Sequence, residues 1–245
     1  MRVGLVGFGR TGKSVADECL RDPECSLTWV LKKSRQHAGD FVGVMRGFDS
    51  HEGEIFSLAD IKPESFFREH PVDIILDFAG PEAIHTYRAG AKDGIRVVSA
   101  VSDYEQAYLD ELRELSQHTA VLHSPNITLG INLLLKACQL LQKAMPSVSI
   151  SIVEEHFSEK SGVSGTALHM AEVLAVDQEK EVHSVRVGET LSKHQVLFGF
   201  PHQMIRLTHE VVTRDAFGHG ALFCARQLLA KPNGLYSMEE FFTTP

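Results

Sequence analysis

The sequence contains few cysteines and no long apolar run, and both shortages limit what the chain can be. Its four cysteines, Cys19, Cys25, Cys138 and Cys224, show no CxxC spacing, which argues against a zinc ribbon and a disulfide framework. No segment approaches the roughly 18 consecutive apolar residues of a transmembrane helix, and the N-terminus shows no secretory leader pattern. We therefore expect buried free thiols, no membrane partner and a cytoplasmic protein.

Basic residues are also scarce. Lys and Arg total 24 against 32 Asp and Glu, which gives a net charge of -8 at pH 7. Nucleic-acid binding requires a concentrated basic surface, so we expect no nucleic-acid partner. The histidines show no paired metal-ligand spacing, and we expect no metal ion. A chain of 245 residues, 43% of them hydrophobic, is nevertheless long enough to bury a substantial core.

Two kinds of hydrophobic pattern follow one another along the chain. In the first part, short apolar runs alternate with amphipathic helical segments, which is typical of a Rossmann-type doubly wound parallel sheet. In the second part, polar and apolar residues alternate with period two around one long helical segment, which predicts an α+β domain on an open mixed sheet. The alternating stretches are residues 147–153, 182–187 and 203–211.

These patterns predict an α/β protein with two domains. We expect a dinucleotide-binding domain at residues 1–126 and a substrate and oligomerisation domain at residues 127–218. Residues 219–245 should contain a C-terminal helix. Whether that helix packs back on the N-terminal domain is left open by the sequence alone.

A glycine-rich turn follows the first expected strand. Gly7-Phe8-Gly9-Arg10-Thr11-Gly12 fits G-x-G-x-x-G between a strand at 2–6 and a helix at 13–20. Glycines here let the backbone turn tightly and approach a pyrophosphate, which binds where the N–H groups and dipole of the helix N-terminus attract anions. An ordinary glycine-rich turn is the alternative. The strand–helix–strand context favours a cofactor site formed by these six residues.

The residues after the second expected strand indicate which dinucleotide binds. NAD-binding proteins usually place Asp or Glu there to bind the ribose hydroxyls, whereas this chain has Lys32 and Lys33. Cations suit the 2′-phosphate of NADPH, so we expect NADPH as the preferred cofactor. Lysines in such a position are also common in plain solvated loops, which keeps NADH open as the alternative.

A second chemically useful group begins where the strand of residues 147–153 ends. It contains His156, Lys160 and then Ser164-Gly165-Thr166 before an apolar helix at 167–175. A helix start with hydroxyls can hold a carboxylate, Lys160 can pair with another, and His156 can act as a general acid. Alone, each would be better explained as a surface histidine, a solvated charge or a helix cap. Their clustering predicts a substrate site.

Residues of both groups resemble the dihydrodipicolinate reductase family. Glu154 to Lys160, followed by Ser164-Gly165-Thr166-Ala167, resembles the family signature E-x-H-H-x-x-K-x-D-x-P-S-G-T-A. Other matching segments extend the resemblance over nearly the whole chain. They are the glycine turn, Asp77-Phe78 with Pro81-Glu82, Ser124-Pro125-Asn126 with Gly130 and Asn132, Arg186-Val187-Gly188, His194-Gln195-Val196, and the segment from His209 to Ala221.

The resemblance implies an NAD(P)H-dependent oxidoreductase that reduces a cyclic imine dicarboxylate. Its reaction would be the reduction of 4-hydroxy-tetrahydrodipicolinate to tetrahydrodipicolinate in diaminopimelate and lysine biosynthesis, carried out by a homotetramer. His156 would be the proton donor, Lys160 would assist and orient, and Ser164, Gly165 and Thr166 would hold a ring carboxylate. The implied cofactor contacts are Gly7, Phe8, Gly9, Arg10, Thr11, Gly12, Lys32, Lys33, Phe78, Ser99, Ala100, Val101, Pro125, Asn126 and Ile127.

Departures from the family pattern affect both sites. Phe157 stands in place of a second histidine and offers no hydrogen-bonding atom, and the loop before Ser164 is one residue shorter and lacks the Asp and Pro. Ser99-Ala100-Val101-Ser102 replaces G-T-T-G, and Ala79 replaces a threonine. Two alternatives therefore stay open: a paralogous reductase or dehydrogenase of another amino or imino acid, and a dinucleotide-binding sensor that has lost the reaction.

Overall fold

The computed structural model describes residues 1–102 and 104–242 and separates into two compact units. Unit 1 joins Met1–Ile127 to the chain from Phe217 onward, and unit 2 is Thr128–Ala216. These limits differ from the sequence-based divisions after residues 126 and 218 by one and two residues, respectively.

The end of the chain belongs to unit 1 because of close helix packing. Helix α9 (Asp215–Leu229) carries Gly218, and a side chain at Gly218 would collide with Glu18 of helix α1 (Arg10–Arg21). The C-terminal segment is also more than a helix, because strand β11 (Gly234–Tyr236) adds to the sheet of unit 1 through parallel pairing with β6 (Ala120–His123).

Unit 1 is built on a seven-stranded parallel sheet. Its remaining strands are β1 (Arg2–Val6), β2 (Ser26–Lys32), β3 (Glu54–Ser57), β4 (Ile74–Asp77) and β5 (Arg96–Ser99). The spatial order is β11-β6-β5-β4-β1-β2-β3, with every neighbouring pair parallel. The order reverses between β1 and β4, and ligands of open α/β sheets bind outside the carboxyl ends of the strands at such a point. The predicted Rossmann-type sheet is confirmed.

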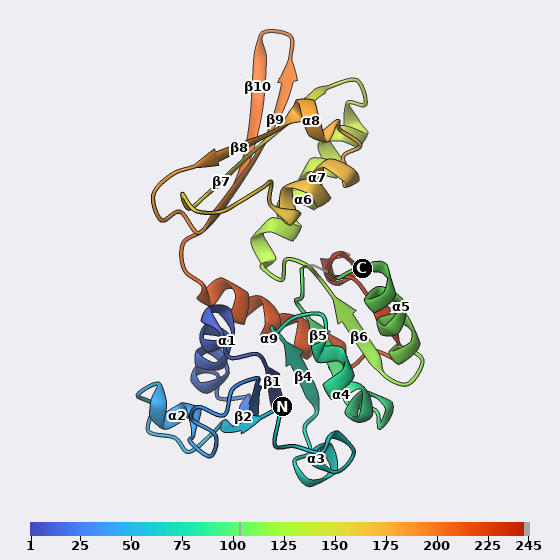
Figure 1. Ribbon diagram of the computed structural model, residues 1–245. Coiled ribbons are helices and arrows are strands. Elements are labelled where there is room, and N and C mark those ends of the chain that lie inside the picture. Colours follow the sequence, from blue (N-terminus) through green and yellow to red (C-terminus); the bar gives the residue numbers. More distant parts are fainter. Residues whose placement is uncertain (103, 243–245) are drawn as a thin grey trace. The chain divides into compact units, whose positions relative to one another are not determined.

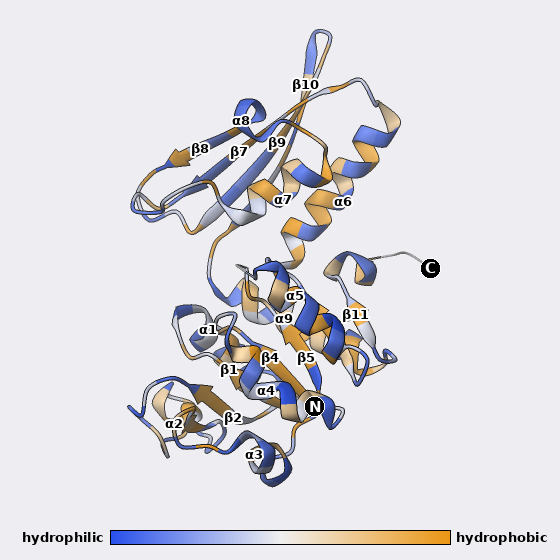
Figure 2. Ribbon diagram, turned by 45° about the vertical axis from the view of Figure 1, so that its right-hand side comes forward, coloured by the Kyte–Doolittle hydropathy of each residue, from blue (hydrophilic) through white to orange (hydrophobic). Residues whose placement is uncertain are grey.

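Apolar side chains alternate between the two faces of this sheet and bury helices against both. Helix α3 (Pro63–Glu69), helix α4 (Ala83–Lys92) and helix α5 (Gln106–Leu115) contact one another in succession and form a core on one face (Figure 1). That core contains Val6, Leu31, Trp29, Phe66, Phe67, Ile75, Ile84, Tyr87, Val97, Leu112 and Val121. Helix α1 contacts β1 and β2. Figure 2 shows β4 and β5 in hydrophobic colours, as strands covered by helices require.

Unit 2 is a smaller α+β layer. Its strands are β7 (Ser149–His156), β8 (Val182–Arg186), β9 (Ser192–Phe200) and β10 (Gln203–Val211), in the order β10-β9-β7-β8. The β7–β8 pair is parallel and the other two pairs are antiparallel, so the sheet is mixed, as predicted. Helices α6 (Leu129–Ala144) and α7 (Gly165–Val173) bury one face of it, with Ile131, Leu135, Ile152, Met170 and Phe198 in the core.

Several elements gave no clear signal in the sequence, and all of them except the nine-residue β9 are short. They are strands β3, β9 and β11, helix α2 (Val42–Met45), helix α8 (Gln178–Glu181) and the 3-10 helix η1 (Met238–Phe242). Among the helices formed by residues 1–102 and 104–242, none is long and apolar enough to cross a membrane.

The turn between β1 and α1 depends on glycine at two positions and leaves open space at a third. Gly7 has φ +98°, and a Cβ atom there would lie 2.6 Å from the Phe78 backbone. A Cβ atom on Gly12 would lie 2.1 Å from the Gly7 carbonyl oxygen. Gly9 has φ -79°, and no atom lies within 4 Å of the position its Cβ would take. The fold therefore requires Gly7 and Gly12 but not Gly9.

Alanine substitutions should separate these roles. We expect Gly12→Ala to lower the free energy of unfolding by about 2 kcal/mol or more, because the clash is with backbone that cannot move aside. Gly9→Ala should stay within about 0.5 kcal/mol of the wild type. Urea denaturation of the two variants measures both values. Equal losses in the two variants would contradict this account of the turn.

Candidate active site

The N-terminus of α1 is suited to an anion. Gly9 is its N-cap residue and supplies no side-chain hydrogen bond, and the first turn contains no acidic residue. The N–H groups of a first helical turn have no partner within the helix, and together with the helix dipole they attract phosphate. The open space at Gly9 leaves room for a pyrophosphate to approach the backbone. The residues present therefore fit a dinucleotide.

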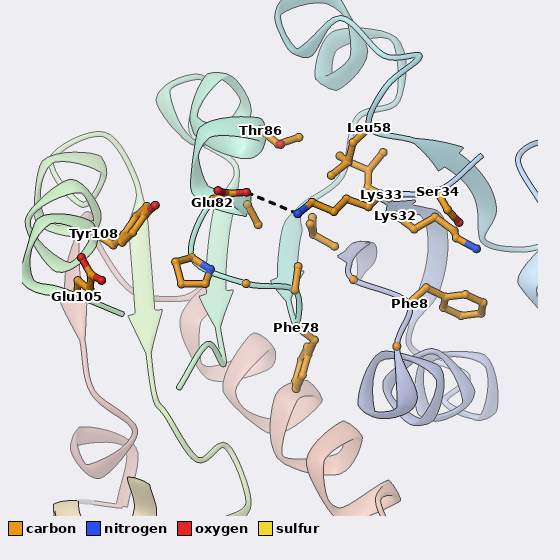
Figure 3. A pocket seen from close by; sticks show the side chains of 18 residues that line it. Phe8, Lys32, Lys33, Ser34, Leu58, Phe78, Glu82, Thr86, Glu105 and Tyr108 are labelled. Atoms are coloured by element: carbon orange, nitrogen blue, oxygen red, sulfur yellow. Dashed lines mark ion pairs between the residues drawn. The ribbon is translucent and has the colours of Figure 1, made fainter. Parts of the chain in front are cut away.

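A cavity of about 1050 Å³ lies beside this helix start. Figure 3 shows its lining, in which Lys33 points toward Glu82 while Lys32 points another way. The Lys33 Nζ atom lies 3.6 Å from a Glu82 carboxylate oxygen, and both side chains are largely exposed. Lys32 donates a hydrogen bond from Nζ to the Gln36 carbonyl oxygen at 3.0 Å. Both lysines lie at the edge of a cavity large enough for a nucleotide.

A second, smaller cavity of about 220 Å³ lies at the ends of β4 and β5 in the same unit. It is lined by Thr11, Phe78, Ala79, Ala100, Val101, Ser102, Pro125, Ile127 and Phe217. Phe78 and Ala79 line both cavities. The two cavities thus form neighbouring parts of one binding region.

The two cavities bring together most of the predicted cofactor residues. They are Gly7, Phe8, Gly9, Thr11, Lys32, Lys33, Phe78, Ala100, Val101, Pro125 and Ile127. Arg10, Gly12, Ser99 and Asn126 line neither cavity. Gly12 and Ser99 are buried behind the surface, while Arg10 is exposed on the first turn of α1.

Asp77 anchors the backbone beneath both cavities, and sequence reasoning gave it no role. Its carboxylate is fully buried and accepts hydrogen bonds from the Ala79 N–H at 3.0 Å, the Tyr104 hydroxyl at 3.3 Å and the Ser99 hydroxyl at 3.4 Å. Burial raises the pKa of Asp77 to about 6, and these donors oppose the rise. The signals in the sequence were an acidic residue at the end of an apolar strand and the resemblance of Asp77-Phe78 to a family segment.

In unit 2, the register of the sheet gathers polar side chains around Glu154. Alternate residues of β7 face the helices, so Ile150, Ile152, Glu154 and His156 are buried in turn. Glu154 pairs in register with His194 of β9 and with Ser184 of β8. His156 pairs with Arg186 of β8. A polar cluster therefore continues the apolar core at one end of the sheet.

Glu154 is fully buried and bound on both carboxylate oxygens. One oxygen is hydrogen-bonded to His156 Nδ1. The other accepts from the Ser184 hydroxyl at 2.5 Å and from Arg186 Nη2 at 2.6 Å. Burial by itself raises the pKa of Glu154, but Arg186, Ser184 and His156 together lower it by more than burial raises it. The pKa of Glu154 is therefore below its usual value. The side chain is an anion at neutral pH.

The buried imidazole of His156 is governed by the same contacts. Burial lowers the pKa of His156, and Glu154 raises it again in part, while Lys160 and Arg186 lower it. The ring packs edge to face on His194, with ring centroids 5.4 Å apart. Burial also lowers the pKa of His194, to about 3, which keeps that ring neutral. His156 is thus the ring of this pair whose pKa is supported by a directly bound carboxylate.

The loop after β7 carries the other predicted substrate residues. Ser164 is the N-cap of α7 and accepts a hydrogen bond from the Ala167 N–H at 3.1 Å. Its hydroxyl also lies 3.0 Å from His194 Nε2, so Ser164 is buried and engaged inside the protein. Gly165 is exposed and Thr166 half-buried at the first turn of the helix. Lys160 accepts a hydrogen bond on its carbonyl oxygen from Arg186 Nε at 2.9 Å.

Glu154, His156 and His194 each bring one nitrogen or carboxylate oxygen within 4.8 Å of the others. A cation placed there would stand beside the Arg186 guanidinium, which already binds the same carboxylate. The charge of Arg186 disfavours a metal ion at this position. The absence of a metal therefore stays a prediction with a physical reason.

Known proteins resemble the chain over its whole length. Family models described as "Dihydrodipicolinate reductase, N-terminus" and "Dihydrodipicolinate reductase, C-terminus" match residues 1–127 and 130–242. A 4-hydroxy-tetrahydrodipicolinate reductase of Thermosipho africanus is 31% identical over 98% of this chain and 97% of its own. One of Caldanaerobacter subterraneus is 29% identical, covering 95% and 94%.

A solved structure shares the fold. It is the dipicolinate-bound dihydrodipicolinate reductase from Paenisporosarcina sp. TG-14, with a TM-score of 0.79, 22% identity and 99% of each chain covered. Because the two family models together account for nearly every residue, the chain belongs to the dihydrodipicolinate reductase family.

Proposed function

We propose that the protein reduces 4-hydroxy-tetrahydrodipicolinate to tetrahydrodipicolinate with NAD(P)H, a step of diaminopimelate and lysine biosynthesis. The observation that carries the proposal is the match of both family models to the chain. The chain also has an anion-binding helix start in unit 1 and a histidine bound to a carboxylate in unit 2. The relatives that align over nearly their full length are named for the same reaction.

The residues of unit 1 would hold the cofactor. When bound, the reduced nicotinamide supplies a hydride to ring carbon four of the substrate. The backbone at Gly9 binds the pyrophosphate, and Thr11 and Phe78 contribute to the smaller cavity next to it. Lys32 and Lys33 stand at the end of β2, where a 2′-phosphate would be bound. This placement favours NADPH over NADH.

The residues of unit 2 would bind the ring acid and supply the proton. The N–H groups and hydroxyl at Gly165 and Thr166 bind one ring carboxylate, and Lys160 orients the ring through a charged contact. Because His156 gives Nδ1 to Glu154, its Nε2 is the nitrogen that delivers a proton to the enamine left by hydride addition. Overall, substrate, NAD(P)H and one proton yield tetrahydrodipicolinate, NAD(P)+ and water.

A second candidate is supported by one residue. Phe157 stands where the family places another histidine and is half-buried in the loop after β7. An apolar ring there suits a substrate with less polar surface at that position. The same chemistry could then serve reduction of another cyclic imino acid.

Turnover is the direct test. With substrate generated by its synthase and NADPH, the wild type should consume the nicotinamide absorbance band. We expect His156→Gln to lower kcat about 100-fold or more, since a general acid contributes that much, and Lys160→Ala to raise KM as well. His118→Gln, at an exposed position in unit 1, is the control and should be unaffected. A wild type that binds NADPH without turnover would favour another imino acid or a sensor.

Cofactor preference tests Lys32 and Lys33. We expect Lys32→Ala/Lys33→Ala to weaken NADPH binding about tenfold or more, because charge-assisted contacts to the 2′-phosphate are lost, and to leave NADH within about twofold. Glu82→Gln should tighten NADPH binding, because it frees Lys33 from its ion pair. Isothermal titration measures both dinucleotides. Lys92→Ala, an exposed lysine at the end of α4, is the control. Equal losses for both dinucleotides would contradict the assignment.

The uncovered face of the unit 2 sheet supports the further proposal of a homotetramer. Met204 and Val185 are exposed there at 48% and 41%, and Leu197 pairs with Arg206 between them. Apolar side chains exposed among polar ones, here the Glu155–Lys193 ion pair and the Gln195–Thr208 hydrogen bond, are typical of subunit contacts. We expect light scattering to give the mass of four chains, and Leu197→Asp to reduce it with unit 2 still folded by circular dichroism. A monomeric wild type would exclude this assembly.

The four buried free cysteines agree with a cytoplasmic enzyme.

A further inference from the structure

Arg186 connects the two parts of the unit 2 site. Its Nη2 donates to the Glu154 carboxylate at 2.6 Å, and its Nε donates to the Lys160 carbonyl oxygen at 2.9 Å. Nη2 also donates to the carbonyl oxygen of Gly162. One guanidinium thus binds the carboxylate that holds His156 and the backbone of the loop that carries Lys160.

The loop depends on this support. It spans the residues from Phe157 to Ser164, and Gly162 within it has φ +62°. The Lys160 N–H turns back to the Phe157 carbonyl oxygen at 3.1 Å. The planar fork of an arginine can bind a carboxylate and neighbouring carbonyl groups in one fixed geometry, which a lysine cannot reproduce.

Fold stability alone gives little reason for this arrangement. Glu154 is fully buried, and the Arg186 side chain is 20% exposed. A buried ion pair often contributes no net stability relative to apolar residues, because desolvating both charges offsets their attraction. The fixed geometry of the Glu154–Arg186 ion pair, rather than its contribution to stability, is therefore the property to be explained.

The charges around His156 give the pair an electrostatic effect too. The facing groups are Glu154 on β7, Arg186 on β8, His194 on β9 and Lys160 in the loop. His209 on β10 lies in register with His194, one strand further away. Glu154 raises the pKa of His156, whereas Arg186 and Lys160 lower it. The two members of the ion pair thus act on the imidazole in opposite directions.

We propose that the Glu154–Arg186 ion pair is a positioning device, in which Glu154 orients the His156 proton donor and Arg186 fixes the Lys160 loop relative to it. The inference rests on the proposed function for its kinetic consequences only. Neither residue needs to touch the substrate. Both act through His156 and Lys160.

Substitutions of the two residues should move the pH profile in opposite directions. The donor must be protonated, so kcat falls as pH rises through the pKa of His156. Glu154→Gln removes the charge that raises this pKa, so the alkaline limb should move down by about one pH unit. The maximal kcat should fall by no more than about tenfold. Arg186→Ala removes a charge that lowers the pKa, so the limb should move up. A role in folding alone would produce no such opposite shifts.

Arg186 variants test the loop. We expect Arg186→Ala to raise KM about tenfold, because the Lys160 backbone loses its charge-assisted donors, and added guanidinium ion to restore part of the activity. Arg186→Lys should keep the positive charge but leave KM above the wild-type value, because a lysine cannot reproduce the planar geometry of the guanidinium. Glu155→Gln is the matched control, since the Glu155 ion pair with Lys193 joins β7 to β9 and lies on the other sheet face. It should leave both the limb and KM unchanged.

A measurement without turnover separates this inference from the proposed function. Nitrogen NMR of the His156 ring in the full-length protein should show Nδ1 protonated in the wild type, and a lower pKa in Glu154→Gln. The double variant Glu154→Gln/Arg186→Gln leaves no unpaired buried charge and serves if a single variant unfolds. Unchanged titration of His156 in both would overturn the proposal. If the variants show the expected shifts in the pKa of His156 but the wild type shows no turnover, the positioning proposal stands and only the reductase assignment is rejected.

Discussion

Both candidate binding regions depend on the same constraint, which is that a buried carboxylate must find hydrogen-bond donors. Asp77 ends a buried strand of unit 1 and is bound by neutral donors, the Ala79 N–H and two hydroxyl groups. Glu154 lies near the end of a buried strand of unit 2 and is bound by a cation as well. The different partners give the carboxylates opposite pKa shifts.

These opposite shifts suit opposite tasks. Asp77, with a pKa of about 6, is bound to backbone that borders both cavities, and neutral partners are sufficient to hold that backbone in place. Glu154 has to remain charged beside His156, because only an anion keeps the imidazole able to hold a proton in a buried place. Arg186 supplies the charge that allows Glu154 to remain ionised.

The sequence predicted the parts of this arrangement that rest on local pattern. Apolar runs alternating with helices predicted the parallel sheet, and the Ser164 cap was predicted from a serine ahead of an apolar helix. Strand β11 has three residues, too few for a periodic signal. The roles of Glu154 and Arg186 could not be predicted, because they arise from the register between strands that are far apart in the chain. A carboxylate beside a histidine looks the same in sequence whether it is solvated or buried.

The structure also changes how the departure at Phe157 is understood. From the sequence alone, loss of a histidine in the loop after β7 and loss of a loop residue look like damage to the site. Yet the loop backbone is held at Lys160 and Gly162 by Arg186, which lies on another strand and is retained. The Phe157 side chain is not needed for that support. The geometry that joins His156 to Lys160 is therefore set elsewhere in the sheet and does not depend on the residue at position 157.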